Sequence, residues 1–339
     1  MISIKKNFSL QKLNSFGLPV STKKFVEINS TDQAIDLLRS GQMKDQKKLV
    51  LGKGSNLLFT QNFDGIIIKV NIDGIHVVKE NSTHFWVKSG AGVVWHDLVE
   101  SCIKANFGGI ENLSLIPGTV GAAPIQNIGA YGVELKDIFE ALEAINLENG
   151  EKKYFTSQEC AFGYRNSIFK TELKDKFLIT NVVLRLLKEP ILNISYGNIK
   201  EVLQKSRKNE LTIRDVSDAI ISIRQSKLPD PEKVGNAGSF FKNPVIPLDL
   251  FNAIKKSFPN IPFYDQPENQ VKVPAAWLID QCNLKGMRHK GAAVHLNQPL
   301  VLINENKATG QDILELSEIV QEKVKNKFGL MLEPEVRIL

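Results

Sequence analysis

The segment that most constrains this fold is residues 115–132, which read LIPGTVGAAPIQNIGAYG. It holds four glycines, two prolines and no charged residue. Glycine weakens a helix, and proline removes a hydrogen bond from a central strand, so neither regular element suits the segment. It is also too apolar for a solvated linker. We therefore predict a buried irregular loop whose glycines let backbone N–H groups approach a bound anion such as a pyrophosphate.

The length and composition are those of a globular protein with more than one domain. At 339 residues the chain is long for one compact core, so two or three domains are expected. No apolar run is long enough to cross a bilayer, and the first residues lack the apolar core of a signal peptide. The three cysteines are scattered without a CxxC pair, which is typical of a reducing compartment. We predict a cytoplasmic protein with no membrane partner.

The formal net charge of +6 favours an anionic partner. The lysines are dispersed and form no basic run interleaved with aromatic residues, so nucleic acid is not the expected partner. Nucleotides and sugar nucleotides fit the same charge equally well, and charge alone does not decide. We expect no metal site, because no HExxH motif or other paired spacing occurs among His76, His84, His96, His289 and His295.

Hydrophobic periodicity predicts an α+β protein with a strand-rich middle. A strand, a capped helix and a second strand form a small βαβ unit over residues 20–52. The stretch 189–209 is expected to be a surface excursion, irregular apart from 200–205. A capping box at Thr212 and Asp215 opens a helix and a new α/β pattern, which indicates a boundary near 210–230. The predicted strands are 24–29, 48–51, 65–70, 75–79, 84–89, 138–147, 152–156, 177–187, 299–304 and 332–338, and the other predicted helices are 30–38, 95–104, 248–257, 275–282 and 311–328.

A second glycine loop, residues 52–56, follows the predicted strand 48–51. Its GxG pattern is not a Rossmann fingerprint, because Leu57 stands where the third glycine belongs and no crossover helix fits before Gly65. It is not a P-loop either, since no GK[ST] follows at the required spacing. A tight turn between two strands is the ordinary alternative.

Three further segments carry side chains suited to catalysis. Tyr164 and Arg165 follow a glycine, and a guanidinium there is able to bind a carboxylate or phosphate in bidentate fashion. Ser239 lies among glycines, prolines and phenylalanines in what we predict to be a rigid loop, which suits a proton donor; it has no GxSxG motif, so a hydrolase triad is poorly supported. Glu335, near Arg337, suits a proton relay or an arginine partner. The ordinary alternatives are a surface ion pair, an Asn-Pro turn and an exposed edge charge, respectively.

Taken in order, these segments resemble the UDP-N-acetylenolpyruvoylglucosamine reductase family, the flavoenzymes of peptidoglycan precursor synthesis. The resemblance covers nearly the whole chain, and the ordered set is far more specific than any one motif. The excursion around 195–197 further resembles the longer subtype of the family, in which a tyrosine loop folds over the substrate. The matching motifs lie at 14–17, 52–58, 116–121, 124–132, 164–167, 238–244, 275–280 and 335–337.

The resemblance implies a vanillyl-alcohol-oxidase or PCMH-type FAD-binding fold of two α+β subdomains, followed by a C-terminal α/β substrate-binding domain. The implied parts are FAD-binding subdomains at 1–70 and 71–210, the substrate-binding domain at 211–330, and a terminal strand at 331–339 that carries Glu335. The implied enzyme is an NADP-dependent UDP-N-acetylmuramate dehydrogenase. NADPH reduces a non-covalently bound FAD, which passes hydride to the enolpyruvyl group of a UDP sugar. The chain is expected to act as a monomer on this small-molecule substrate.

By the same resemblance, Ser239 is the proton donor, and Arg165 and Glu335 polarise the substrate carboxylate and stabilise an enol-like intermediate. Protonating carbon needs a positioned donor and a site that excludes water. The implied substrate contacts are Tyr164, Tyr196, Lys227, Asn243 and Gln298. The implied FAD contacts are Gly52, Lys53, Gly54, Ser55, Asn56, Pro117, Gly118, Thr119, Gly121, Gln126, Asn127, Gly129, Ala130 and Tyr131.

Two alternative functions are kept beside this one. A flavin-dependent alcohol or sugar oxidase of the same fold superfamily often tethers FAD through His or Cys, and residues 115–132 contain neither. A basic binding module for nucleic acid or nucleotides would be colourless and would bind polyanions with a steep salt dependence.

Overall fold

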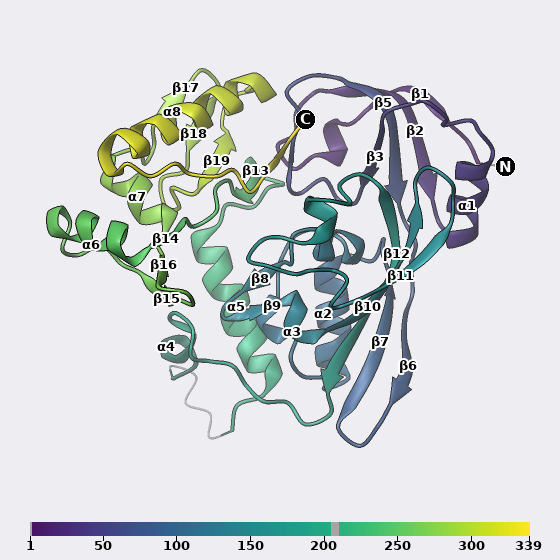
Figure 1. Cartoon of the computed structure of the whole chain (residues 1–339), viewed down its shortest axis with the longest axis horizontal. Helices are drawn as coiled ribbons and strands as arrows, with labels where there is room; N and C mark the ends of the chain where they lie inside the picture. The colour runs from purple at the N-terminus through teal and green to yellow at the C-terminus, as the bar shows by residue number, and fades with distance from the viewer. Residues whose placement is uncertain (1, 205–209) are drawn as a thin grey trace. The chain divides into compact units, whose positions relative to one another are not determined.

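The structure, a computed structural model, describes residues 2–204 and 210–339 and divides into two compact units. The first unit contains the chain up to Phe8, Thr22–Gly54 and Asp64–Ser226, and the second contains Ser9–Ser21, Ser55–Phe63 and Lys227–Leu339. Figure 1 labels their elements along the chain. Two short N-terminal segments therefore belong with the C-terminal third. The predicted division at residues 70, 210 and 330 stays a prediction.

A four-stranded sheet of the first unit contains the predicted βαβ pattern. Its strand order is β1-β2-β5-β3, and β3 pairs in parallel with β5, so β5 lies between the two strands of that pattern. The consecutive residues Ile66, Ile67 and Ile68 of β5 are all buried, which is typical of a strand covered on both faces. Helix α1 begins after Ser30, whose Oγ accepts the N–H of Gln33, as predicted. The elements are β1 (Lys5–Ser9), β2 (Ser21–Ile28), α1 (Thr31–Arg39), β3 (Lys48–Leu51) and β5 (Phe63–Val70).

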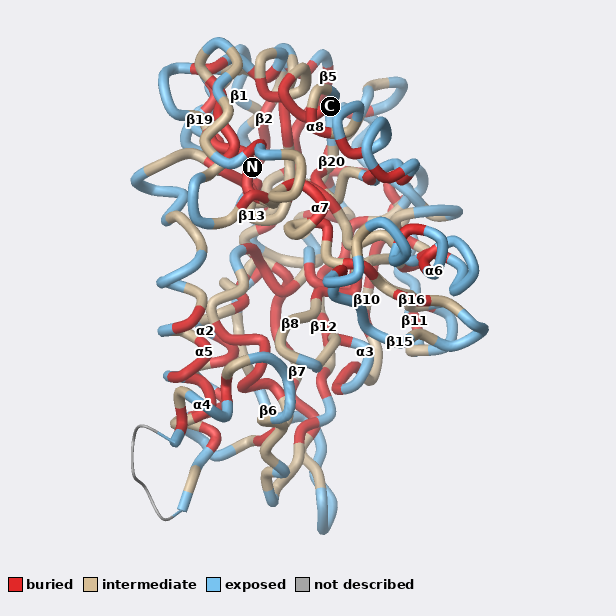
Figure 2. The backbone as a smooth tube through the Cα atoms, turned by 90° about the vertical axis from the view of Figure 1, so that its left-hand side faces the viewer, coloured by how far each residue is buried: buried red, intermediate tan, exposed pale blue. Residues whose placement is uncertain are grey.

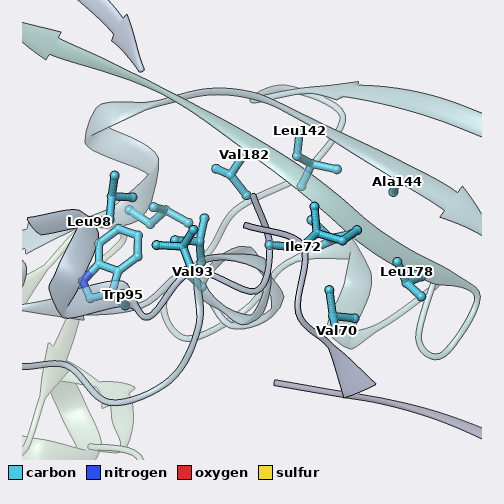
Figure 3. Packing of buried hydrophobic residues seen from close by; sticks show 14 of the residues in the cluster. Val70, Ile72, Val93, Trp95, Leu98, Leu142, Ala144, Leu178 and Val182 are labelled. Carbon is cyan, nitrogen blue, oxygen red and sulfur yellow. The ribbon is translucent and has the colours of Figure 1, made fainter. Parts of the chain in front are cut away.

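A five-stranded antiparallel sheet forms the strand-rich middle of the chain. Its order is β11-β10-β12-β7-β6, with the long β-branched strand β12 in the centre. Figure 3 shows Leu142 of β10 and Val182 of β12 in one apolar cluster with Trp95 and Leu98 of α2. The elements are β6 (Ile75–Glu80), β7 (His84–Gly90), α2 (Trp95–Lys104), β10 (Phe139–Asn146), β11 (Lys152–Thr156) and β12 (Phe177–Leu187).

Short elements and helix α5 complete the first unit. Thr212 Oγ1 accepts the N–H of Asp215, and Asp215 Oδ2 accepts the N–H of Thr212, so the predicted capping box opens α5. The predicted run 200–205 corresponds to α4 up to Gln204, and residue 205 lies outside the described residues. The elements are η2 (Glu111–Leu113), η3 (Val120–Ile125), β8 (Gly129–Ala130), β9 (Val133–Glu134), α3 (Leu135–Ile138), η4 (Ile168–Lys170), α4 (Ile199–Gln204) and α5 (Ile213–Lys227).

The second unit is built on a four-stranded sheet of order β13-β19-β18-β17. Helix α8 starts at a capping box of Thr309 and Asp312 and ends at Phe328, after which Gly329, with a φ of +71°, forms the C-cap. A three-stranded sheet, β14-β16-β15, and the parallel pair β20-β4 complete the unit. The elements are η1 (Gln11–Leu13), β4 (Leu57–Leu58), β13 (Gly235–Ser239), β14 (Val245–Pro247), α6 (Leu248–Ser257), β15 (Tyr264–Gln266), β16 (Gln270–Lys272), α7 (Ala275–Gln281), β17 (Arg288–His289), β18 (Ala292–Val294), β19 (Val301–Asn304), α8 (Gly310–Phe328) and β20 (Arg337–Ile338).

The terminal strand is shorter than the sequence predicts. Only β20 is a strand, whereas 332–338 was expected. Glu335 N–H donates to Phe240 O at 2.8 Å, but two residues later Arg337 N–H donates to Asn56 O at 3.1 Å. Because the segment changes its pairing partner between these residues, it cannot form one continuous ladder. Glu335 therefore lies in the extended loop before β20 and not on the strand.

Each unit has its own apolar core, which Figure 2 shows as buried segments along the backbone. The first core includes Phe155 and Trp95, and the second includes Phe240 and Phe251, all nearly inaccessible to solvent. No helix of the described chain is long and apolar enough to span a bilayer.

Candidate active site

The two glycine loops come together in the first unit. Gly52 follows β3, and a Cβ atom placed on it would lie only 2.5 Å from Thr119 Oγ1. Glycine at this position therefore permits a contact between the loop after β3 and residues 115–132. This contact brings together two of the predicted FAD-binding residues.

Residues 115–132 form an irregular loop, as predicted, but they are only partly covered by protein. The loop contains the 3-10 turn η3 and the two-residue strand β8. Thr119 and Val120 are buried, whereas Ile116 is half-buried and Pro117 is exposed. The prediction that the whole loop is buried is therefore corrected: one part anchors it in the core, and an apolar part retains surface for a ligand.

Arg165 lies in a tight turn that is tied to this loop. Gly163 and Asn166 exchange backbone hydrogen bonds of 3.0 and 3.2 Å around it. Its φ of +50° is uncommon for a residue other than glycine. Arg165 Nη2 donates to Gly129 O at 2.7 Å, and Asn127 Nδ2 donates to Gly163 O at 3.0 Å. The structure thus places the predicted catalytic arginine beside two predicted FAD contacts.

A second guanidinium, which the sequence analysis did not identify, lies near Arg165. Arg224 is on α5, and its Nε is buried without a hydrogen-bond partner among the described residues. Burial lowers the pKa of Arg224, with Tyr131 opposing and Arg165 adding to that effect. A half-buried guanidinium whose Nε has no hydrogen-bond partner among the described residues, with a second cation nearby, is costly without a counter-charge, so this arrangement favours an anionic ligand. The sequence offers one weak signal, an arginine about one helical turn before Lys227.

Positive charge also accumulates next to the first glycine loop. Lys69 of β5 is half-buried, and its burial lowers its pKa. The charge of Lys53 lowers the pKa of Lys69 further, and that of Glu27 opposes this. Two ammonium groups that repel each other are a suitable environment for a phosphate or pyrophosphate.

Two predicted substrate contacts of the first unit lie close to other candidate residues. The rings of Tyr131 and Tyr196 meet edge to face, with centroids 6.4 Å apart. The guanidinium carbon of Arg165 lies 5.9 Å from the centroid of the Tyr164 ring, within cation–π distance. Tyr196 therefore lies against the 115–132 loop, and Tyr164 lies in the Arg165 turn.

In the second unit, Ser239 and Glu335 lie on neighbouring segments. Ser239 is the last residue of β13 and pairs with Val301 of β19, whereas the sequence analysis expected a loop. The strand forms because the distant strand β19 supplies its hydrogen bonds. The next residue, Phe240, is buried and accepts the N–H of Glu335 through its carbonyl at 2.8 Å. Asn56 Nδ2 donates to Glu335 O at 3.3 Å, so a third predicted residue joins this group.

The remaining predicted residues of the second unit have different environments. Asn243 Oδ1 accepts the N–H of Ala275 at 2.9 Å and so holds the start of α7. Gln298 lies in the turn before β19, where its carbonyl accepts the N–H of Val301 at 2.9 Å. Lys227 is exposed at the end of α5. The predicted residues of the first unit are Gly52, Lys53, Gly54, Pro117, Gly118, Thr119, Gly121, Gln126, Asn127, Gly129, Ala130, Tyr131, Tyr164, Arg165 and Tyr196, and those of the second are Ser55, Asn56, Lys227, Ser239, Asn243, Gln298 and Glu335.

Two family models match this chain. One, described as an FAD binding domain, matches residues 22–153. The other, described as the C-terminal domain of UDP-N-acetylenolpyruvoylglucosamine reductase, matches residues 230–339. Together with a solved structure of the same fold, they confirm the predicted fold class, a PCMH-type FAD-binding domain followed by a C-terminal domain.

Similar proteins match over the full length. The UDP-N-acetylenolpyruvoylglucosamine reductase of Flavobacterium johnsoniae is 49% identical over 339 residues, and the match covers 100% of this chain and 100% of the relative. That of Amoebophilus asiaticus is 47% identical over 338 residues, again covering 100% of each chain. That of Haemophilus ducreyi is 43% identical, covering 98% of this chain and 95% of the relative. The solved UDP-N-acetylenolpyruvylglucosamine reductase of Thermus caldophilus is 24% identical with a TM-score of 0.70, covering 100% of this chain and 99% of that one, and shows the likeness of fold.

Proposed function

We propose a mechanism from one premise, that this chain belongs to the UDP-N-acetylenolpyruvoylglucosamine reductase family. It is a flavoprotein oxidoreductase of peptidoglycan precursor synthesis, a UDP-N-acetylmuramate dehydrogenase that acts on a UDP sugar. The proposal adds NADPH as the electron donor and UDP-N-acetylglucosamine enolpyruvate as the acceptor. It also assigns the roles of individual residues.

The surroundings of the two glycine loops support FAD binding in the first unit. The contact between Gly52 and Thr119, the partly covered apolar loop 115–132 and the charges of Lys53 and Lys69 suit a flavin with a pyrophosphate. Bound FAD supplies the hydride that reduces the enolpyruvyl double bond. The loops hold the cofactor through non-covalent contacts, with Asn127 and Gly129 tied to the Arg165 turn.

Arg165 is proposed to bind and polarise the substrate carboxylate. Its hydrogen bond to Gly129 O holds the guanidinium in one orientation. An oriented guanidinium binds a carboxylate through two parallel hydrogen bonds and stabilises the charge that develops on it. The half-buried guanidinium of Arg224 increases the attraction of this region for an anion. Tyr164 and Tyr196 are the proposed sugar-nucleotide contacts of this unit.

Ser239 is proposed to donate a proton to the carbon next to the reduced methylene. The buried Phe240 fixes the backbone that follows the hydroxyl. Glu335 is proposed to stabilise the enol-like intermediate. A donor must be held close to the carbon it protonates, and a well-ordered strand end provides such a position. Lys227, Asn243 and Gln298 are the proposed sugar-nucleotide contacts of the second unit.

The structural observation that carries this assignment is the hydrogen bond from Glu335 N–H to Phe240 O at 2.8 Å. It places the two candidate residues of the second unit on adjacent segments although they are far apart in the sequence. The test is an anaerobic assay of the purified yellow protein. NADPH should bleach the flavin absorption, and UDP-N-acetylglucosamine enolpyruvate should restore it with formation of UDP-N-acetylmuramate.

Two controls sharpen this assay. NADH in place of NADPH measures the cofactor preference. An air-saturated sample without the UDP sugar tests the oxidase alternative, which requires rapid reoxidation of the flavin by oxygen. If the UDP sugar does not accelerate reoxidation, the proposed substrate is wrong. We also propose a cytoplasmic monomer, and light scattering of the holoenzyme at several concentrations tests the monomeric state.

A further inference from the structure

Asn112 joins two segments that carry proposed binding residues. It lies in η2 and is 1% exposed. Its Nδ2 donates to Tyr131 O and to Asn193 O, each at 2.9 Å. Tyr131 lies near the end of residues 115–132, here called the flavin loop. Asn193 belongs to residues 190–198, here called the tyrosine loop, which carries Tyr196. One buried amide group thus uses both of its N–H bonds to connect the two loops.

The tyrosine loop lies directly against the end of the flavin loop. Asn193 Nδ2 donates to Gly132 O at 3.4 Å, and Asn193 Oδ1 accepts the hydroxyl of Ser195 at 3.1 Å. A Cβ atom on Gly132 would lie 3.3 Å from Tyr196 Cβ. The rings of Tyr131 and Tyr196 are also in edge-to-face contact. The position of Tyr196 therefore depends on the contact between the two loops.

The turn that carries Asn112 is held on both sides. Trp95 Nε1 of α2 donates to Leu113 O at 2.9 Å. Ser114 Oγ lies 2.8 Å from Ser217 Oγ of α5, and both serines are buried. These bonds fix η2 to two helices of the first unit. Asn112 is therefore itself held in place, and its hydrogen bonds fix the flavin loop and the tyrosine loop relative to η2.

We propose that Asn112 is a positioning residue for the UDP sugar, because it holds the tyrosine loop on the flavin loop and so keeps Tyr196 in place to bind the sugar nucleotide. This inference rests on the function proposed above. Asn112 acts through the backbone carbonyls of Tyr131 and Asn193, and not on the reacting atoms. An asparagine amide offers two donors on a short side chain, whereas an ionised aspartate of the same shape offers none. Its loss leaves two part-buried carbonyls without these donors and so weakens the docked loop.

The test is Asn112→Asp in the full-length, flavin-loaded protein. The oxidised holoenzyme is titrated with UDP-N-acetylglucosamine enolpyruvate, and the change in flavin absorption gives Kd. Loss of two hydrogen bonds is expected to raise Kd by about tenfold or more. KM should rise in parallel while kcat changes less, because the catalytic groups are untouched. Flavin content should stay close to that of the unmodified protein.

A double-mutant cycle distinguishes positioning from a general loss of stability. If Asn112 acts through Tyr196, then Asn112→Asp should add little to the Kd of a Tyr196→Ala variant. Asn14→Asp is the matched control in the second unit. Asn14 is 5% exposed, and its Nδ2 likewise donates to two backbone carbonyls, Leu10 O at 2.9 Å and Leu18 O at 3.1 Å. This control is expected to lower stability similarly and to leave Kd nearly unchanged.

An unchanged Kd in Asn112→Asp overturns the inference. So does a Kd effect of Asn112→Asp that simply adds to that of Tyr196→Ala, or a rise of Kd in Asn14→Asp as large as that in Asn112→Asp. If Asn112→Asp does not fold, Asn193→Ala replaces it. That half-buried side chain can be removed with less damage, and loss of its bond to Gly132 O is expected to raise Kd about two- to threefold; no rise would again overturn the inference. An unmodified holoenzyme that neither binds nor reduces the UDP sugar refutes the proposed function as well, whereas the outcomes above refute the inference alone.

Discussion

Gly52→Ala tests whether the contact of the two glycine loops forms the flavin site. The added Cβ would lie 2.5 Å from Thr119 Oγ1 and 3.5 Å from Thr119 Cβ and Cγ2. The shortest of these distances lies well inside van der Waals contact. Thr119 is 3% exposed and β-branched, so it cannot easily change its rotamer. The loops must therefore move apart, because the backbone of Gly52 is itself compatible with alanine.

The magnitude follows from the cost of overpacking. An extra methyl group in a well-packed site costs about 1–3 kcal/mol. Without cofactor, the partly exposed loop 115–132 can relax, so most of this cost falls on the FAD-bound state. Titration of the deflavinated variant with FAD, followed by quenching of flavin fluorescence, should therefore show a Kd raised by about 5- to 150-fold.

A second substitution makes the reasoning refutable. Thr119→Ala removes Oγ1 and Cγ2 and leaves only a Cβ atom at 3.5 Å, which is an ordinary contact. The double variant Gly52→Ala/Thr119→Ala should therefore bind FAD more tightly than the two single effects predict when added. Normal FAD affinity of Gly52→Ala, or strict additivity in the double variant, would show that the contact does not shape the flavin site.

Three other predictions concern catalysis and pH. Ser239→Ala should accept electrons from NADPH normally but reduce the UDP sugar about 10²–10⁴-fold more slowly in stopped-flow assays, whereas Ser257→Ala, at an exposed position of α6, should match the unmodified protein. Glu335→Gln should show the same split between half-reactions, and unchanged turnover in either variant would remove its assigned role. Burial raises the pKa of the Glu111 carboxyl above its ordinary 4.5. The protonated carboxyl therefore contributes its full share to the stability of the fold below pH 4.5, and this share is lost as pH rises through the raised pKa. The Tm of Glu111→Gln, measured relative to that of the unmodified protein, should therefore rise between pH 4 and pH 7. A Tm difference that stays constant over this range would contradict the prediction.

Regular elements with local signals could be predicted closely from the sequence. The helix predicted at 95–104 is α2 (Trp95–Lys104), and the strand predicted at 177–187 is β12 (Phe177–Leu187). Their boundaries depend on periodicity and β-branched composition, which are properties of adjacent residues. The pairing of β13 and the short β20 depends on distant partners and was not predicted.

Which segments belong to which unit also depends on contacts that leave no local pattern in the sequence. A Cβ atom on Gly235 would lie 2.3 Å from Phe16 O, so glycine is required where β13 passes the N-terminal segment. Asn304 Nδ2 donates to Phe16 O at 2.9 Å across 288 positions of the chain. Such contacts attach residues 9–21 to the C-terminal third. Because these contacts join segments far apart in the sequence, local sequence patterns do not reveal them.

A sequence reveals candidate ligand contacts more readily than it reveals the residues that position those contacts. Arg165 and Ser239 stand in motifs, so their chemistry could be predicted, although not the carbonyl that orients Arg165. Arg224 has the appearance of a solvated helix residue, and only its buried Nε and the nearby charge of Arg165 make it a candidate for anion binding. Asn112 has no periodic or motif signal, because its two acceptors lie 19 and 81 positions further along the chain. A positioning residue is defined by distances between segments, and in this protein those distances appear only when the chain is folded.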